Sequence, residues 1–222
     1  PDLASAASRA DLAQFRDRFF SGLRMMTVVI LPAAAAYVIL ARPIVAFLLE
    51  RGAFSGSNGD LTADCLKGFA VGLVPFSLYL FALRGFYAFR DTRTPFFLNC
   101  LENAFNIILA LALEPWLGTK GLAYAYSGAY LLAAAVALRA LERRSGAFGT
   151  AALRWRRMVV RMLVAAVLLA VVAGAVLALL PDGLPSPIKI AAGSLAGLAV
   201  YIPALRMMRV REAVELVKRL RP

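Results

Sequence analysis

Six apolar runs, each long enough to cross a lipid bilayer as a helix, dominate this sequence of 222 residues. A helix needs roughly 20 apolar residues to span a hydrocarbon core of about 30 Å. Backbone N–H and C=O groups in lipid must be satisfied within the chain, so such runs predict helices. We therefore expect an all-α integral membrane protein with six transmembrane helices, at about residues 27–49, 68–89, 96–115, 121–140, 159–180 and 188–208.

The segments between the runs predict the division of the chain. In residues 1–26, apolar side chains such as Phe15, Phe19 and Leu23 recur at helical spacing, with arginines between most of them. This pattern indicates either an amphipathic helix at a membrane surface or a solvated lead-in to the first span. The other expected parts are four spans over 27–140, a basic loop over 141–158, a pair of spans over 159–208 and a basic tail over 209–222.

The positive charges predict the orientation. The chain holds 25 Lys and Arg against 13 Asp and Glu, a formal net charge of +12. With six spans, 20 of these cations fall on the side that holds both ends, four fall on the other side, and Arg42 lies within the first run. Cytoplasmic loops are enriched in Lys and Arg, so we expect a multi-pass membrane protein with both ends of this segment in the cytoplasm. No basic groove with interleaved aromatic residues is present, so we expect no nucleic-acid partner.

The residues of common catalytic and metal sites are scarce. The chain has no His and only two Cys, which form no CxxC pair. It also lacks a nucleophile with a matching base, a phosphate-binding glycine loop and carboxylates paired at catalytic spacing. We therefore expect no enzyme, no catalytic residue, no metal and no cofactor.

The third apolar run carries a polar face. Asn99, Glu102, Asn103 and Asn106 follow one another at i, i+3, i+4 and i+7, which places three amides and one carboxylate on one side of a helix. Exposing these groups to lipid would cost several kcal/mol. The pattern favours the wall of a polar cavity on a substrate path, or else a seam of hydrogen bonds between helices.

Other polar side chains within the runs are further candidates for the substrate path. Arg84 lies at about the depth of Glu102, measured from the same membrane face, so the two could pair, or Arg84 could extend to the headgroups. Tyr124 and Ser127 stand among small residues of the fourth run. Such neighbours are also typical of two helices in close contact.

Proline and glycine mark two further places. Arg42 precedes Pro43 in the first run, which indicates either a broken helix of the kind that forms transporter binding sites or a kink that faces the surface. Gly193 and Gly197 form a GxxxG pair in the sixth run, which predicts close helix packing. The fifth and sixth runs hold few polar residues, so we expect them to face lipid.

The segment "GFYAFRDTRTP", residues 85–95, forms the turn between the second and third runs. Its aromatic residues Phe86, Tyr87 and Phe89 are typical of an interfacial belt. Thr94 is a suitable N-cap, and Pro95 suits the first position of a helix.

The charges of this turn are candidates for a cytoplasmic gate. Arg90 and Arg93 hold the turn on the positive side of the membrane. Asp91 is not explained by that rule. It could accept hydrogen bonds within the turn, or it could pair with Arg90 or Arg93 across a moving gate.

Three segments together resemble the MurJ/MviN family of lipid II flippases, within the superfamily of multidrug, oligosaccharidyl-lipid and polysaccharide exporters. They are "LPAAAAYVILARPIVAFLLERGAF", "GFYAFRDTRTP" and "NIILALALEPWLGTKGLAYAYS". The resemblance implies helices nine to fourteen of a two-lobe transporter that works by alternating access, so the N-terminal half would be missing. It also implies that the last two helices form a groove for the lipid tail. Of the sodium-site residues known in some members, only Asn106 matches, since Ala110 and Tyr126 stand at the other positions.

The expected function is the C-terminal part of a flippase for lipid II or a related undecaprenyl-linked sugar. One alternative is an exporter of other lipid-linked oligosaccharides or of drugs. The other is a membrane scaffold that does not transport, whose basic loops bind anionic membrane lipids or protein partners.

Overall fold

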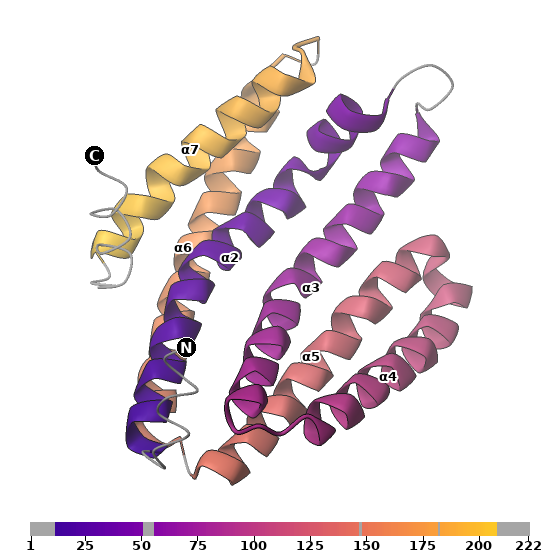
Figure 1. Ribbon diagram of the computed structural model, residues 1–222. Helices are drawn as coiled ribbons and strands as arrows, with labels where there is room; N and C mark the ends of the chain where they lie inside the picture. The colour runs from indigo at the N-terminus through magenta and orange to yellow at the C-terminus, as the bar shows by residue number, and fades with distance from the viewer. Residues whose placement is uncertain (1–11, 51–55, 147, 182, 208–222) are drawn as a thin grey trace. The chain divides into compact units, whose positions relative to one another are not determined.

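The computed structural model describes residues 12–50, 56–146, 148–181 and 183–207 (Figure 1). The six runs are all helical, and each helix is long and apolar enough to cross a membrane. In this described part the helices are α2 (Leu12–Leu49), α3 (Ser57–Ala88), α4 (Arg93–Leu117), α5 (Thr119–Ser145), α6 (Gly149–Leu179) and α7 (Ser186–Met207). The all-α fold with six candidate spans is thereby confirmed.

The start of α2 differs from the expectation. Residues 12–26 form no separate helix, because α2 continues without a break from Leu12 to Leu49. The apolar face of this segment is also not available to lipid, since Phe15, Phe19 and Leu23 are fully buried against protein. The predicted helix on the membrane surface is therefore wrong for the described residues. Amphipathic spacing reveals that a face is covered, but not whether lipid or protein covers it.

The expected basic loop over 141–158 is also mostly helix. Residues 141–145 form the last turn of α5, and α6 begins at Gly149. Phe148, next to α6, is buried and its N–H donates to Glu142 Oε1 at 3.1 Å. Arginine is a good helix former, so a run of positive charge does not by itself interrupt a helix.

The chain divides into two compact units. Unit 1 comprises residues 1–27 and 72–159, and unit 2 comprises residues 28–71 and 160–222. Helices α2, α3 and α6 each contribute one part to unit 1 and the other part to unit 2.

Unit 1 has a core rich in large aromatic side chains. Phe15 and Phe89 lie with ring centroids 4.6 Å apart, and Phe20 meets Phe148 edge to face at 5.0 Å. Such pairs contribute about 0.5–1.5 kcal/mol beyond the area they bury. The buried members of this core are Phe15, Phe19, Phe20, Leu23, Tyr79, Ala82, Leu83, Phe86, Leu98, Ala133, Ala134, Ala137, Leu141, Phe148 and Ala151.

Helices α4 and α5 form a hairpin within unit 1 (Figure 1). Gly118 joins them with φ of 58°, a left-handed conformation that glycine adopts without strain. Its N–H donates to Glu114 O at 2.7 Å and so closes the end of α4. A Cβ at Gly121 would lie 2.8 Å from Leu113 O, so only glycine lets the two helices approach this closely.

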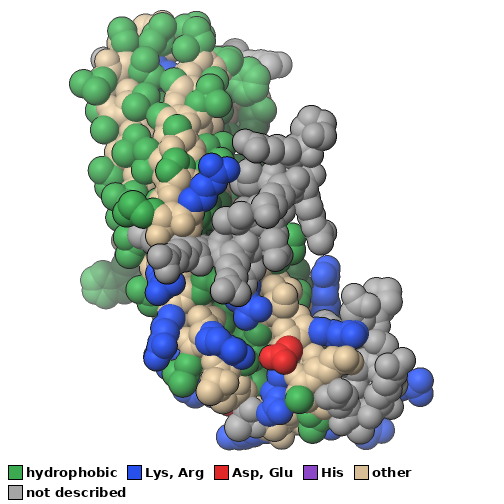
Figure 2. Space-filling view, turned by 90° about the vertical axis from the view of Figure 1, so that its left-hand side faces the viewer, with side chains coloured by type: hydrophobic (Ala, Val, Ile, Leu, Met, Phe, Trp, Pro, Cys, Tyr) green, Lys and Arg blue, Asp and Glu red, His purple; other side chains and the backbone are tan. Residues whose placement is uncertain are grey.

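Unit 2 is built around small residues. A Cβ at Gly193 would lie 2.8 Å from Leu40 Cδ2, and one at Gly197 would lie 2.9 Å from Leu169 Cγ. The GxxxG pair therefore packs α7 closely against α2 and α6, as its spacing predicts. Large apolar side chains of α6 and α7 remain exposed, and hydrophobic side chains cover much of the face seen in Figure 2. The expectation that these two helices face lipid stays a prediction.

Candidate functional site

The polar face of α4 is divided between a buried and an exposed part. Glu102 is only 4% exposed, whereas Asn99 and Asn103 are exposed and Asn106 is half-buried. Tyr79 of α3 donates its hydroxyl hydrogen to Asn99 Oδ1 at 2.8 Å. Asn103 Nδ2 donates to the backbone oxygen of Asn99 at 2.9 Å. One helix face thus supplies both a hydrogen bond between helices and accessible amides.

Tyr79 is a residue that the sequence reasoning missed. It is buried in unit 1, and its ring lies 5.5 Å from that of Tyr130 on α5. Tyr130 in turn meets Tyr126 at 4.6 Å and Phe76 at 4.9 Å. Through its bond to Asn99, Tyr79 links this cluster to the face of α4 that also carries the buried Glu102. The two hydroxyls of the mostly apolar stretch "VPFSLYLF", those of Ser77 and Tyr79, were the signal that could have drawn attention to it.

The other candidates in the spans lie apart from this cluster. Arg84 is exposed, and no ion pair joins it to Glu102 among the residues that the structure describes. Tyr124 is also exposed, whereas Ser127 is buried. A Cβ at Gly72 would lie 3.0 Å from Ser127 Cα, so Ser127 marks a close contact between α3 and α5.

The turn at residues 89–92 ends α3 through its backbone. Arg90 has φ of 57°, its N–H donates to Tyr87 O at 3.0 Å, and the N–H of Asp91 donates to Phe86 O at 3.1 Å. These two bonds form a Schellman motif, which closes the last carbonyls of a helix. An arginine here takes the place that glycine usually occupies. Arg90 is therefore part of the helix end, and its exposed side chain extends outward.

Asp91, not Thr94, caps the start of α4. The Asp91 carboxylate accepts hydrogen bonds from the Thr94 N–H at 3.0 Å and from the Thr94 hydroxyl at 2.8 Å. Helix α4 begins at Arg93, and Thr92 at the boundary makes no capping bond with its side chain. The expected N-cap at Thr94 is therefore wrong, because the carboxylate two residues before the helix takes that role.

The basic partner of Asp91 comes from α5. Arg144 Nε lies 3.8 Å from Asp91 Oδ2, and its guanidinium lies 5.9 Å from the centre of the Phe89 ring. Arg90 and Arg93 are both exposed. Among the described residues, neither forms the predicted ion pair with Asp91. The two hydrogen bonds from Thr94, with the charge of Arg144 as a smaller cause, hold the pKa of Asp91 below its usual value.

The expected aromatic belt at this turn is only partly present. Tyr87 is exposed, but Phe86 is buried in the core of unit 1, and Phe89 is partly buried with its ring tilted by 53° against that of Phe15. The expected place in the belt is therefore wrong for Phe86, and protein covers part of Phe89. In these positions the packing of α2 against α3 covers rings that the sequence pattern assigned to the interface.

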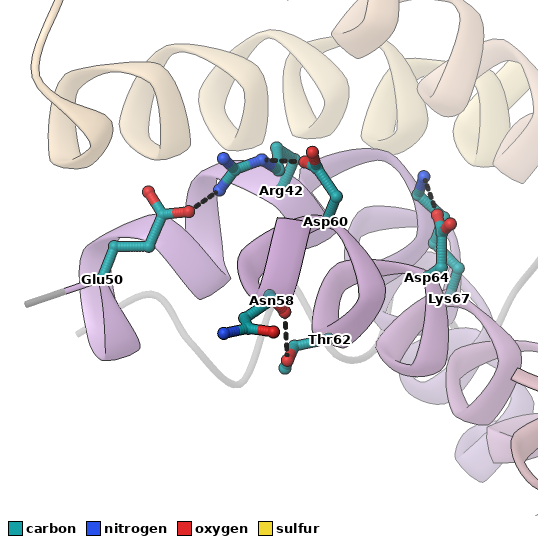
Figure 3. A network of polar contacts seen from close by, with 7 residues as sticks. All are labelled: Arg42, Glu50, Asn58, Asp60, Thr62, Asp64 and Lys67. Atoms are coloured by element: carbon teal, nitrogen blue, oxygen red, sulfur yellow. Dashed lines mark hydrogen bonds and ion pairs between the residues drawn. The ribbon is translucent and has the colours of Figure 1, made fainter. Parts of the chain in front are cut away.

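The positive charge of Arg42 in unit 2 is compensated by two carboxylates, those of Glu50 and Asp60 (Figure 3). Arg42 forms an ion pair with Glu50 and another with Asp60, whose Oδ1 lies 2.7 Å from Arg42 Nε. The helix continues through Pro43 to Leu49, so no broken helix exists at this point. Lys67 Nζ also pairs with Asp64 Oδ1 at 3.0 Å in the same region.

An apolar groove of about 390 Å³ runs along unit 2. Its walls are small or branched apolar side chains, with Ser194, Tyr201 and Arg206 as the polar exceptions. The lining residues are Val28, Val29, Pro32, Ala33, Ala36, Leu40, Leu169, Ala173, Gly193, Ser194, Leu198, Tyr201, Ile202, Leu205 and Arg206. Because α2, α6 and α7 all contribute, the groove is shaped by the consecutive helices α6 and α7 together with α2, which is distant in sequence.

A hydrogen bond between α7 and α2 fixes one wall of the groove. The Tyr201 hydroxyl donates to Val28 O at 3.0 Å, across 173 residues of sequence. Pro32 has no N–H, so the carbonyl four residues before it, that of Val28, lacks its helical donor. Tyr201 supplies that donor. A buried carbonyl without a partner would cost roughly 1–3 kcal/mol.

Metal ligands do not gather in the part of the chain that the structure describes. It holds no group of three or more His, Cys, Asp or Glu side chains able to bind an ion. Asn106, the residue that matches a sodium site by resemblance, lies half-buried on α4.

Comparison with known proteins gives consistent results. The sequence profile of the family described as "Lipid II flippase MurJ" matches residues 1–184. A probable lipid II flippase MurJ of Rhizobium meliloti is 35% identical over 125 residues, which are 56% of this chain and 23% of that protein. Its counterpart in Rhizobium tropici is 32% identical over 144 residues, 65% of this chain and 27% of that protein.

The fold is shared with a solved structure described as "Lipid II flippase MurJ, inward closed conformation". The TM-score is 0.73 at 21% sequence identity, over 93% of this chain and 42% of that chain. The helices thus define a multi-pass membrane protein with a transporter fold. The chain belongs to the lipid II flippase MurJ family, and it spans about a quarter of the length of the curated relatives it matches.

Proposed function

We propose that this chain is the C-terminal part of a flippase that carries lipid II across the bacterial inner membrane by alternating access. The observation that carries this proposal is the apolar groove of unit 2. A lipid-linked sugar needs an apolar surface for its tail and a wet, polar path for its headgroup, because charged sugars cannot cross hydrocarbon unaided. The groove suits the tail, and the family suggests lipid II as the cargo.

The accessible amides of α4 suit the second requirement. Asn99 and Asn103 are exposed on a helix that is otherwise apolar, which is costly unless water or protein faces them. We assign them, with Asn106 and the exposed Arg84 and Tyr124, to the wall of the headgroup path. Glu102 and Ser127 support this wall from within unit 1, since both are buried.

The remaining parts of the proposal concern topology and partners. The excess of Lys and Arg favours cytoplasmic ends for this segment and contact with anionic membrane lipids. The other wall of the path would come from an N-terminal half of the same protein. In this arrangement, the turn with Arg90, Asp91 and Arg93 lies at the cytoplasmic face, where Asp91 holds α4 in place.

Filling the groove tests the function directly. Ala33→Phe or Ala36→Phe introduces a ring into the groove, whereas Ala35→Phe places the same ring on α2 outside its lining. The longer protein containing this chain is expressed in cells depleted of their own lipid II flippase, and growth is measured. We expect rescue by the unchanged protein and by Ala35→Phe, and at least about a tenfold loss of colonies with the groove variants, since a blocked tail site prevents binding.

Protein abundance in the membrane is measured in parallel, so that a folding defect is recognised. Rescue by a stable Ala36→Phe protein would contradict the tail-binding groove. Failure of the unchanged, well-expressed protein to rescue would exclude lipid II as cargo and favour another lipid-linked sugar or a drug.

Cysteine labelling tests the polar wall. After Cys65 and Cys100 are replaced by Ser, single cysteines at Asn99 and Asn103 should react with a membrane-impermeant maleimide, because water reaches them. A cysteine at Leu111, an exposed apolar position on the same helix, should react slowly, because lipid surrounds it. Equal reactivity at all three positions would contradict a polar path, as would inert cysteines at Asn99 and Asn103 in an active protein.

A further inference from the structure

A basic hollow lies where α2 and α6 begin. It measures about 540 Å³ and is lined by Asp17, Arg18, Ser21, Arg24 and Arg154, all within unit 1. Figure 2 shows Lys and Arg side chains gathered on the same side of the molecule, with little acidic colour among them. Three guanidinium groups against one carboxylate give the lining a net positive charge.

The fold fixes the position of these side chains. Asp17, Ser21 and Arg24 follow one another at i, i+4 and i+7 on one face of α2. The opposite face, with Phe15 and Phe19, is fully buried in the core, so α2 cannot rotate the polar face away.

The α6 wall is fixed in the same way. The Trp155 ring lies 6.3 Å from that of Phe20, and this contact orients the first turns of α6. Arg154, next to Trp155, consequently faces the hollow from the side opposite α2. Leu153, its other neighbour, is an exposed apolar side chain of the same unit.

We propose that this hollow binds the phosphate of an anionic phospholipid headgroup. Guanidinium groups match phosphate oxygens in pairs of parallel hydrogen bonds, and the Ser21 hydroxyl adds a donor. The exposed side chain of Leu153, in the same unit, offers an adjoining apolar surface for an acyl chain. This inference rests on the proposed membrane topology, in which the hollow lies at the cytoplasmic leaflet, where anionic lipids attract basic residues.

Tryptophan fluorescence can report binding. This segment has two tryptophans, so Trp116→Phe, with every tryptophan outside the segment also changed to Phe, leaves Trp155, beside Arg154, as the single reporter. The protein is placed in phosphatidylcholine nanodiscs that contain increasing fractions of phosphatidylglycerol. We expect a saturable change in Trp155 emission, and a midpoint shifted about tenfold or more by Arg154→Gln, because a charge-assisted contact with the phosphate is lost.

Arg156→Gln is the matched control. It removes the same charge from the same helix, but it lies two residues on, about 200° around α6, and does not line the hollow. Its midpoint should shift by about twofold at most, as for a screened surface charge. Equal shifts for the two variants, or a response that rises linearly without saturation, would overturn the site in favour of diffuse attraction.

A second set of measurements distinguishes a lipid phosphate from free inorganic phosphate as the ligand. Inorganic phosphate added to phosphatidylcholine nanodiscs should leave Trp155 emission unchanged, and a response equal to that of the lipid would overturn the lipid assignment. The assay requires no transport. A failed lipid site therefore leaves the flippase proposal intact, and failed complementation leaves the fluorescence result interpretable.

Discussion

The two units of this chain pack their helices with side chains of different size. Unit 1 places large rings such as Phe15, Phe19 and Phe86 in full burial, and they interlock with one another across its helices. Unit 2 brings helices together at Gly193 and Gly197, and along Ala33 and Ala36 it leaves a groove. The comparison teaches that side-chain size decides whether packed helices form a solid scaffold or a surface with room for a ligand.

The largest difference should appear on truncation of a core ring. Phe19→Ala in unit 1 should lower the free energy of unfolding by about 3–5 kcal/mol, since it opens a cavity among rings that cannot collapse. Leu198→Ala, on the groove wall of unit 2, should cost less than about 1 kcal/mol, because its side chain is already 44% exposed. Unfolding by SDS in mixed micelles measures both. Similar costs would mean that the units do not differ in packing.

A smaller effect tests how unit 2 is held without large rings. Tyr201→Phe should cost about 1–2 kcal/mol, because the Val28 carbonyl loses the hydroxyl donor that Tyr201 supplies. In a Pro32→Ala background, residue 32 regains an N–H that can bond this carbonyl, so the same change should cost about 1 kcal/mol less. The double-mutant cycle measures this coupling.

Tyr124→Phe is the control for loss of a tyrosine hydroxyl, since Tyr124 is exposed, and it should be nearly neutral. Additive effects of Tyr201→Phe and Pro32→Ala would show that the hydroxyl does not replace the missing helical donor.

The smallest effect concerns the cap of α4 in unit 1. Asp91→Ala should cost about 1 kcal/mol, because the Thr94 N–H loses its acceptor. Asp91→Asn retains an acceptor oxygen for the Thr94 N–H; it loses the second carboxylate oxygen, which accepts from the Thr94 hydroxyl, and the attraction of half-exposed Arg144, so its cost should be smaller than that of Asp91→Ala. Thermal unfolding in detergent at neutral pH ranks the two variants.

The pH dependence of this cap follows from the lowered pKa of Asp91. The folded carboxylate is stabilised, so its contribution is present above the unfolded pKa of about 4 and disappears as pH falls through the lower folded pKa. The difference between the unchanged protein and Asp91→Asn should therefore shrink below about pH 4. A difference that stays constant down to pH 2 would contradict the role of the charged carboxylate.

Much of the fold could be predicted because it depends on local pattern. Each of the six apolar runs is long enough to require a helix in lipid, and the structure places a helix at every one of them. The shared face of Asn99, Glu102 and Asn103 also follows from helical spacing alone. Helix ends were less predictable, since α2, α3 and α6 begin 15, 11 and 10 residues before the expected spans, at Leu12, Ser57 and Gly149. Polar helical turns outside the apolar runs leave no hydropathy signal.

Contacts between helices could not be predicted from such patterns. Nothing in the sequence near Asp91 indicates Arg144, and nothing near Pro32 indicates Tyr201. The full burial of Phe86 and the partial burial of Phe89 likewise depend on which helix covers them.

The sequence by itself determined the class of this protein, its six helices, the asymmetry of its charge and the polar face of α4. Each of these follows from a residue's own chemistry and from spacing along one helix. Only the tertiary structure decided that Glu102 is buried while Asn103 is exposed, and that three helices enclose an apolar groove. The physical reason is that burial and partnership depend on which surfaces meet, and packing settles that between segments far apart in the chain.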